Sequence, residues 1–237
     1  MKQTFLALAF AFLTAAAFAQ VNTFTIDSSK LNKPLMLVLD TIYKADQGSR
    51  VRATDLSKTK ATDAQVDSAI KVAHVADSLN IIKVTQIIDK YGWLGPQDVG
   101  MDGSQALFLV IQHANLATQQ KYLPMIRTAV KDGKTLSSNL ALLEDRVNMR
   151  EGKNQIYGSQ LFRNKSTGKM CFYPIADPDH VDERRKAMGL QPITEYAKFF
   201  SLTWNVEEYK KALPDIEKAI KENKLENKTT AKDLRSH

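Results

Sequence analysis

Residues 91–115 read Tyr-Gly-Trp-Leu-Gly-Pro-Gln-Asp-Val-Gly-Met-Asp-Gly-Ser-Gln-Ala-Leu-Phe-Leu-Val-Ile-Gln-His-Ala-Asn, and this stretch decides the fold. Its first half holds four of the ten glycines, which predicts a tight loop from Gly92 to Gly103. Its second half contains the apolar helix-like run Ala106 to Ile111. We therefore expect a loop that leads into a buried helix over 104–115, whose last turn places Gln112 and His113 inside the protein.

The N-terminus has the features of a secretory signal. Lys2 precedes an uncharged run from Thr4 to Ala17, and Ala17-Phe18-Ala19 has the small-x-small form that signal peptidase cleaves. We expect residues 1–19 to be removed after Ala19 and the protein to be exported, periplasmic or secreted. The alternative is a membrane anchor, but the run is short and no basic stop-transfer residues follow it. We expect no membrane span after signal removal.

Size and composition favour a single disulfide-free domain. Removal of 19 residues from 237 leaves 218, enough for one domain with a substantial core. The only cysteine, Cys171, lies in an apolar run, which favours a packed thiol over a nucleophile. The net charge of +7 becomes +6 without Lys2, and acidic residues are interspersed with the basic ones. We expect no nucleic-acid partner, because no basic face with aromatics stands out.

Helical periodicity dominates the chain up to residue 151. Pro34 suits a helix start, and apolar spacing predicts a helix over 34–47 that Gly48 ends. A polar connector should follow over 51–62, then one long helix over 63–90, or two helices with a break near 78–80, capped by Thr62 or Asp63. Further helices are predicted over 116–132, with Pro124 as a kink, and over 139–151.

The pattern changes at about residue 155. Alternating residues over 155–162 and an apolar run over 169–175 flank the turn sequence 164–168, which predicts a β-hairpin at about 155–175. Short helices should follow over 177–188 and 193–200. We expect a mainly α (α+β) single-domain helical bundle over 34–205 with one small antiparallel β-hairpin packed on it. An extended arm over 20–33 precedes it, and 206–237 form a helix, broken at Pro214, and a charged, frayed tail after Lys224.

Polar residues gather at the ends of these elements, and each has a structural alternative. His113 is the candidate general acid or base, because histidine is the side chain that titrates near neutral pH without perturbation, although a histidine near a helix end is more often a core residue. Asp77 and Asn80 share a helix face. The pairs Asp145-Arg146 and Asp182 with Arg185 could be ion pairs between helices. Gly158 could mark a close contact where no side chain fits.

Most catalytic signatures are missing from the sequence. There is no GxSxG elbow, P-loop, dinucleotide fingerprint or HExxH pattern, and the context of Ser159 is not that of a nucleophile elbow. His74, His113 and His180 are scattered, so we predict no metal ligands and no cofactor, while a carboxylate site using Asp77, Asp98 or Asp102 stays open.

Several segments together resemble a bacterial family, the domain of unknown function 6624. The resemblance covers about 35–196 and rests on Asp46-Gln47-x-x-Arg50, Asp77-x-x-Asn80, Ile87-Ile88-x-x-x-Gly92-Trp93, Val99-Gly100, Gln112-His113-Ala114, Leu143-x-Asp145-Arg146, Gln155-x-Tyr157-Gly158-Ser159-Gln160, Val181-Asp182-x-Arg184-Arg185 and Gly189-Leu190. Two positions depart mildly from the family pattern: Leu94 follows Gly92-Trp93 where family members often have proline, and Asn115 stands where we expect an aspartate, so it supplies no carboxylate for an acid–base role. The resemblance implies the fold and the site residues, but no reaction.

These residues lead us to predict one polar pocket between the helices and the hairpin. His113, Asp77 and Asp46 are the catalytic candidates. The ligand-binding candidates are Gln47, Arg50, Asn80, Trp93, Gln112, Gln155, Tyr157, Gln160, Arg184 and Arg185. An arginine would hold an anionic group of a small polar ligand. Two functions stay open: a noncatalytic ligand-binding, structural or interaction module, which we favour, or a periplasmic hydrolase-like enzyme with His113 as general base and an aspartate as its partner. The sequence leaves the oligomeric state open.

Overall fold

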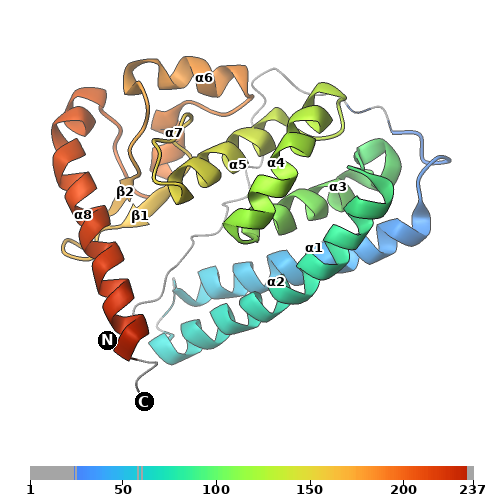
Figure 1. Cartoon of the computed structure of the whole chain (residues 1–237), viewed down its shortest axis with the longest axis horizontal. Helices are drawn as coiled ribbons and strands as arrows, with labels where there is room; N and C mark the ends of the chain where they lie inside the picture. Colours follow the sequence, from blue (N-terminus) through green and yellow to red (C-terminus); the bar gives the residue numbers. More distant parts are fainter. Residues whose placement is uncertain (1–23, 25, 58, 60, 234–237) are drawn as a thin grey trace. The chain divides into compact units, whose positions relative to one another are not determined.

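The computed structural model describes residues 24, 26–57, 59 and 61–233. The predicted signal peptide and part of the predicted arm lie outside them. The described chain is mainly α-helical with one small antiparallel hairpin, as predicted (Figure 1). It forms two compact units, divided within helix α5 between Leu143 and Glu144, where the sequence predicts one domain. We describe each unit separately, as the N-terminal unit (24–143) and the C-terminal unit (144–233).

The N-terminal unit consists of helices whose mutual contacts form one core. They are α1 (Lys33–Ser57), α2 (Asp63–Tyr91), α3 (Pro96–His113), α4 (Leu116–Lys131) and the first half of α5 (Ser137–Arg150). Helices α1, α2 and α3 pack pairwise against one another. The predicted buried helix is confirmed, because every side chain from Ala106 to Gln112 is buried. Its apolar run therefore forms the centre of this unit.

The prediction that the first helix ends at Gly48 is wrong. Helix α1 continues to Ser57 and also includes much of the predicted polar connector. Glycine in a helix costs about 1 kcal/mol relative to alanine, which lowers its stability without ending it. Contacts of Asp46 and Arg50 on either side of Gly48 favour the continued helix. The continuation places Arg50 one turn after Asp46.

Two further boundaries depend on local backbone chemistry. Thr62 caps α2 as predicted, in a capping box with Gln65. Helix α3 begins at Pro96, inside the predicted loop, because proline suits a first helical turn and the Asp98 side chain accepts the Gly95 N–H at 2.8 Å. Gly100 then interrupts the helix with a φ of 73°. The structure therefore divides the predicted loop into a helical turn and a glycine kink.

Asn115, where the resemblance leads us to expect an aspartate, is the N-cap of α4. Its side-chain oxygen accepts the Thr118 N–H at 2.9 Å. Asparagine and aspartate cap helices about equally well, so this departure preserves the local structure. Pro124 lies inside α4.

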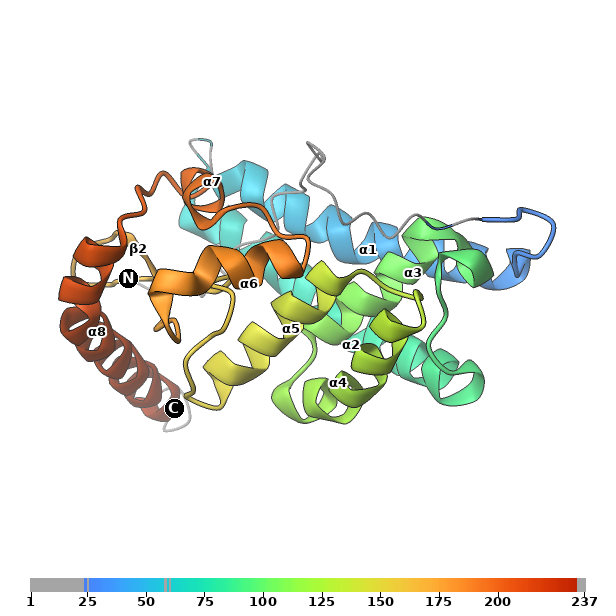
Figure 2. The ribbon, with the colours of Figure 1, turned by 90° about the horizontal axis from the view of Figure 1, so that it is seen from above.

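The C-terminal unit is built around the hairpin. Strands β1 (Leu161–Arg163) and β2 (Met170–Phe172) pair antiparallel, with Phe162 opposite Cys171, and they are shorter than predicted. The short 3-10 helix η1 (Pro178–His180) and the α-helices α6 (Val181–Ala187), α7 (Ile193–Lys198) and α8 (Val206–Asp233) follow. Side chains of β1, β2, α7 and α8 share one apolar core, and α8 lies beside the strands (Figure 2). Helix α8 contains Pro214 and continues past Lys224.

Candidate functional site

Four charged or titratable side chains of the N-terminal unit meet at one point. Helix α1 supplies Asp46 and Arg50, α2 supplies Asp77, and the last residue of α3 supplies His113. His113 Nδ1 lies 2.9 Å from Asp46 Oδ1. Arg50 Nη2 donates to Asp77 Oδ1 at 2.5 Å and lies 3.4 Å from Asp46 Oδ1. We call these four residues the polar cluster.

The Asp46 carboxylate is the buried centre of the polar cluster. Its side chain is completely buried, and Gln47 Nε2 donates to its other oxygen at 2.5 Å. Burial acts to raise the pKa of Asp46, but the hydrogen bond with His113 and the charges of His113 and Arg50 outweigh burial, so the pKa lies below its ordinary value. Asp46 is therefore ionised at neutral pH, and its hydrogen bond selects the His113 tautomer with the proton on Nδ1.

The polar cluster extends from the interior to the surface. Exposed fractions of the side chains rise from 0% for Asp46 and 7% for His113 to 15% for Arg50 and 21% for Asp77. A molecule from solvent would therefore meet Asp77 and Arg50 before His113. His74, which is 74% exposed, stands 4.0 Å from Asp77 at this outer end.

Tyr43 is a neighbour of the polar cluster that the predicted site residues do not include, and beside it lies Asp102, one of the aspartates of the carboxylate site that the sequence left open. Burial, with the charges of Asp102 and Asp46, raises the pKa of Tyr43 above its ordinary value. Tyr43 lies three residues before Asp46 on α1, so the helical repeat was the signal that could have identified it. Tyr43 therefore lies near two carboxylates, those of Asp46 and Asp102.

The remaining predicted residues of this unit are buried. Asn80 lies one turn after Asp77 and is 4% exposed, and its Nδ2 has no hydrogen-bond partner among the described residues. Arg50 Nε and Trp93 Nε1 are also buried donors without a hydrogen-bond partner among the described residues. Gln112, completely buried, instead donates to the Leu142 carbonyl at 3.3 Å. Buried donors without partners are rare and call for an explanation such as a ligand or water.

The hairpin candidates lie in the C-terminal unit, where Gln155 bonds to backbone groups. Its Nε2 donates to the carbonyls of Gln160 and Tyr173, at 3.1 and 2.8 Å. Its Oε1 accepts the Gln160 N–H at 2.8 Å. The Gln160 side chain donates to Ser159 Oγ at 2.9 Å, and Tyr157 Oη lies 3.3 Å from Glu144. Gln155 therefore joins the two sides of the hairpin.

The two predicted arginines also bond to backbone carbonyls. Arg184 donates to the carbonyls of Ile156, Ala176 and Asp177, at 2.6 to 2.8 Å. Arg185 is 1% exposed and donates to the carbonyls of Gln191 and Tyr157, at 2.7 and 2.6 Å. These contacts hold α6 to the segment before β1. They give both arginines a structural role.

Asp145 binds backbone groups of the opposite kind: whereas the arginines donate to carbonyls, its carboxylate accepts N–H groups. Its completely buried carboxylate accepts the N–H groups of Ile156, Tyr157 and Ser159, with shortest distances of 2.6 to 3.0 Å. Burial raises the pKa of Asp145 above its ordinary value, against the opposing effect of these donors. The sequence suggested an ion pair with Arg146, and likewise one for Asp182, whose carboxylate accepts the Ile193 N–H at 2.6 Å. Backbone acceptors and donors of this kind have no signature in a single sequence.

Three members of the polar cluster could hold a metal ion. Asp46, Asp77 and His113 each offer one ligand atom, and these three atoms all lie within 4.8 Å of one another. Two carboxylates and an imidazole suit several divalent metals. However, Arg50 already places a positive charge between the two carboxylates. A cation would therefore compete with this guanidinium.

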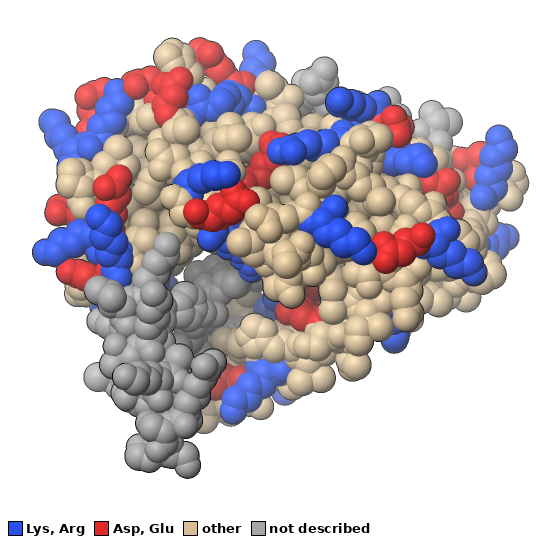
Figure 3. Space-filling model, in the orientation of Figure 1, with Lys and Arg blue, Asp and Glu red and all other residues tan. Residues whose placement is uncertain are grey.

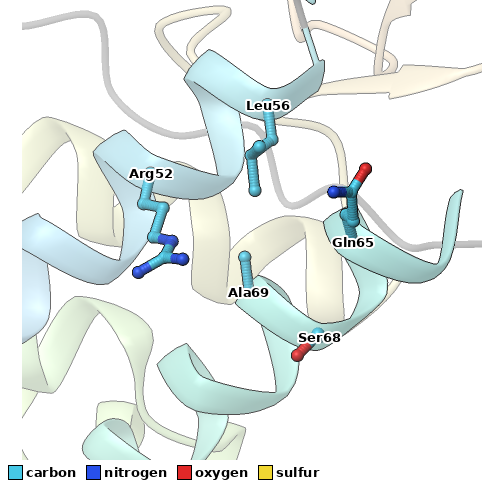
Figure 4. A pocket seen from close by; sticks show the side chains of 5 residues that line it. All are labelled: Arg52, Leu56, Gln65, Ser68 and Ala69. Atoms are coloured by element: carbon cyan, nitrogen blue, oxygen red, sulfur yellow. The ribbon is translucent and has the colours of Figure 1, made fainter. Parts of the chain in front are cut away.

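A separate small pocket lies between α1 and α2. Its volume is about 170 Å³, and Arg52, Leu56, Gln65, Ser68 and Ala69 line it (Figure 4). None of these residues belongs to the predicted site.

The surface in Figure 3 carries both charge signs interspersed, without a large basic region on that face.

The predicted site residues thus fall into two groups. The N-terminal unit brings together Asp46, Gln47, Arg50, Asp77 and His113, with Asn80 one turn from Asp77. Gln155, Tyr157, Gln160, Arg184 and Arg185 belong to the C-terminal unit. A single pocket shared by both groups stays a prediction.

Comparisons with known proteins identify the family. Within the part of the chain that the structure describes, no helix has both the length and the apolar character to span a membrane. No match was found among curated proteins or among solved structures. One family model, described as a family of unknown function (DUF6624), matches residues 35–207. Because this match spans most of the sequence, the chain belongs to the DUF6624 family.

Proposed function

We propose that the polar cluster is an acid–base catalytic site for a small polar substrate, in an exported protein. The observation that carries this proposal is the 2.9 Å contact between His113 Nδ1 and the buried Asp46 carboxylate. Such a pair orients the imidazole, leaves the lone pair on Nε2 and stabilises the imidazolium that forms when Nε2 accepts a proton. An ion pair that only stabilised the fold would not need a histidine as the partner of Asp46, whereas proton transfer near neutral pH does.

Each charged residue then has a role. His113 is the general base that removes a proton from water or from a substrate hydroxyl, and Asp46 is its positioning partner. Gln47 and Arg50 fix the Asp46 carboxylate. Arg50 and Asp77 lie at the outer end of the polar cluster, where a substrate would enter. The reaction class that suits this arrangement is hydrolysis by an activated water molecule.

The unpaired donors favour a substrate with acceptor groups. Arg50 Nε and Asn80 Nδ2 are buried without partners among the described residues. Guanidinium and amide N–H groups bind carboxylate, phosphate or carbonyl oxygens. We therefore expect an anionic or carbonyl-rich small molecule.

A noncatalytic role is the second candidate, and the low exposure of the polar cluster favours it. His113 is 7% exposed and Asp46 is completely buried. A sealed network of this kind could only hold α1, α2 and α3 together. The substitution His113→Asn separates the candidates, because asparagine keeps an N–H donor near the position of Nδ1 and removes the base.

The test combines NMR with a substrate screen. Long-range ¹H–¹⁵N spectra of the wild-type protein above neutral pH should show the proton of His113 on Nδ1, and Asp46→Asn should weaken that preference. Ester, amide, phosphoester and glycoside substrates are screened with wild type and His113→Asn. We expect turnover that His113→Asn abolishes while it folds normally. Turnover that survives in a folded His113→Asn protein, or His113 protonated on Nε2, would contradict the catalytic role.

Export is a separate part of the proposal and rests on the N-terminal sequence. The charged residue, the apolar run and the Ala17-Phe18-Ala19 site support it. Expression of the full chain in a Gram-negative host, followed by fractionation and mass spectrometry, tests it. We expect a periplasmic protein that begins at Gln20. An uncleaved chain in the cytoplasm would contradict export.

A further inference from the structure

Helix α2 carries an apolar stripe on its exposed face. Val72, Val75, Leu79 and Ile82 are 60%, 61%, 58% and 56% exposed. Isolated exposed apolar residues are ordinary, but these four follow one another on one helix. Together they leave roughly 400 Å² of apolar surface, within the range of the largest patches on monomeric proteins, which often have a function. We call these four residues the α2 stripe.

The stripe lies opposite the face by which α2 joins its own core. Ala69, Ala73, Val84 and Ile88 are buried, and the helical repeat places them on the side of α2 away from the stripe. A helix of a soluble unit normally has one apolar face and one polar face. The second apolar face is therefore not explained by the packing of the N-terminal unit.

The spacing of the stripe is that of a coiled-coil seam. The intervals 72–75, 75–79 and 79–82 are three, four and three residues, which are the a and d positions of the heptad repeat. The flanking positions nearest its middle are Ala76 and Ser78, which are small, and the lysines Lys71 and Lys83 lie towards its ends. Small flanks allow a second helix to approach closely. The fitting partner is thus a helix with the same seam.

A second copy of this chain provides such a helix. A two-fold axis places the stripe of one copy on the stripe of the other, and two-fold dimers are the commonest assemblies. Both stripes would contribute roughly 800 Å², and the flanking residues bring the total near the lower limit of specific interfaces, about 1,200 Å². Because α2 is already folded, no helix needs to form on binding.

We infer that α2 is the interface of a homodimer, in which the α2 stripes of two copies pair. The interface is small, so the dimer dissociates in the micromolar range or above. The N-terminal units associate through the outer face of α2, and the polar cluster is not part of the contact. The inference is therefore independent of the proposed function.

Sedimentation velocity of the chain without its signal segment tests the inference. We expect a concentration-dependent species of twice the monomer mass. Leu79→Glu, at an exposed position, should leave the melting temperature of the monomer unchanged and raise the dissociation constant at least about 30-fold, the effect of losing about 2 kcal/mol at an interface centre. Leu37→Glu, at a 71% exposed leucine on α1, is the matched control and should leave the dimer intact.

Charge exchange then identifies the pairing. A mixture of Leu79→Glu and Leu79→Lys chains restores a heterodimer if the helices are parallel. A mixture of Leu79→Glu and Val75→Lys chains restores it if they are antiparallel. Restoration in either mixture supports the α2 interface. A wild-type chain that stays monomeric at several hundred micromolar, a dimer that Leu79→Glu leaves unchanged, or failure of both mixtures would overturn it.

Discussion

The two units bury polar side chains in different ways. In the N-terminal unit, Asp46, Arg50, Asp77 and His113 interact with one another, and the group extends to the surface. In the C-terminal unit, Asp145, Gln155, Arg184 and Arg185 bond mainly to backbone groups, which the chain would otherwise leave unsatisfied. Side chains that satisfy backbone groups fix a loop, whereas charged side chains that satisfy one another can exchange partners with a ligand.

The largest expected effect is that of Asp145→Ala. It leaves the N–H groups of Ile156, Tyr157 and Ser159 buried without an acceptor. We expect a loss of about 3–5 kcal/mol in the free energy of unfolding, measured by urea denaturation. Asp145→Asn keeps one acceptor oxygen and should lose less. A cost below about 1 kcal/mol would contradict the claim that buried side chains of the C-terminal unit stabilise it by binding backbone groups.

Gly158→Ala should be next in size. Gly158 has a φ of 66°, and an added Cβ would lie 2.8 Å from Ile193 and 3.0 Å from Ile175. Backbone strain and overpacking together should cost about 2–4 kcal/mol. Gly152→Ala is the matched control, because its φ is 78° but the space around it is open. It should cost only the backbone strain, about 1–2 kcal/mol. Equal costs in the two thermal or urea denaturation series would show that the close contact is unimportant.

These two positions also show what a single sequence can predict. The buried helix and the Thr62 cap are confirmed, because each depends on neighbours along the chain. The suggestion that no side chain fits at Gly158 is confirmed as well, although the side chains that an added Cβ would meet, Ile175 and Ile193, are distant in the sequence. The partners of Asp145 and Arg184 could not be predicted, because they are backbone groups that carry no residue identity. The sequence left open which aspartate pairs with His113, and the structure pairs it with Asp46. The contact between Arg50 and Asp77 required helix α1 to continue beyond Gly48, which local propensity opposed.

The substitution Asp46→Asn tests whether the charges of the polar cluster stabilise the N-terminal unit, through the pH dependence of the free energy of unfolding. The pKa of Asp46 is below its ordinary value in the folded protein, so ionisation of Asp46 stabilises the fold above about pH 4 and this stabilisation is lost as the pH falls through the folded-state pKa. At pH 7 we expect Asp46→Asn to cost about 1–3 kcal/mol. The difference from wild type should narrow below about pH 4 in urea denaturation. The exposed Asp215→Asn is the control, and a gap that does not change with pH would contradict this account.

The smallest expected effect comes from Arg50→Ala with a divalent cation. Arg50 supplies positive charge to both Asp46 and Asp77, and its removal leaves two carboxylates and an imidazole whose ligand atoms lie within 4.8 Å of one another. We expect Zn²⁺ or Mn²⁺ at ten times its dissociation constant to stabilise this variant by about 1.4 kcal/mol, measured by thermal unfolding and reversed by EDTA. Arg52→Ala, with an exposed arginine two residues further along α1, should show no such gain.

The wild-type protein decides what this last result means. If the wild type gains as much from the cation as Arg50→Ala does, then Arg50 does not occupy the place of a cation, and the polar cluster is a metal centre in which His113 is a ligand rather than a base. If only the variant responds, and His113→Asn in the same background removes the response, then the guanidinium is the resident counterion of the two carboxylates. In that case Arg50 leaves His113 paired with Asp46, which is the state that proton transfer requires.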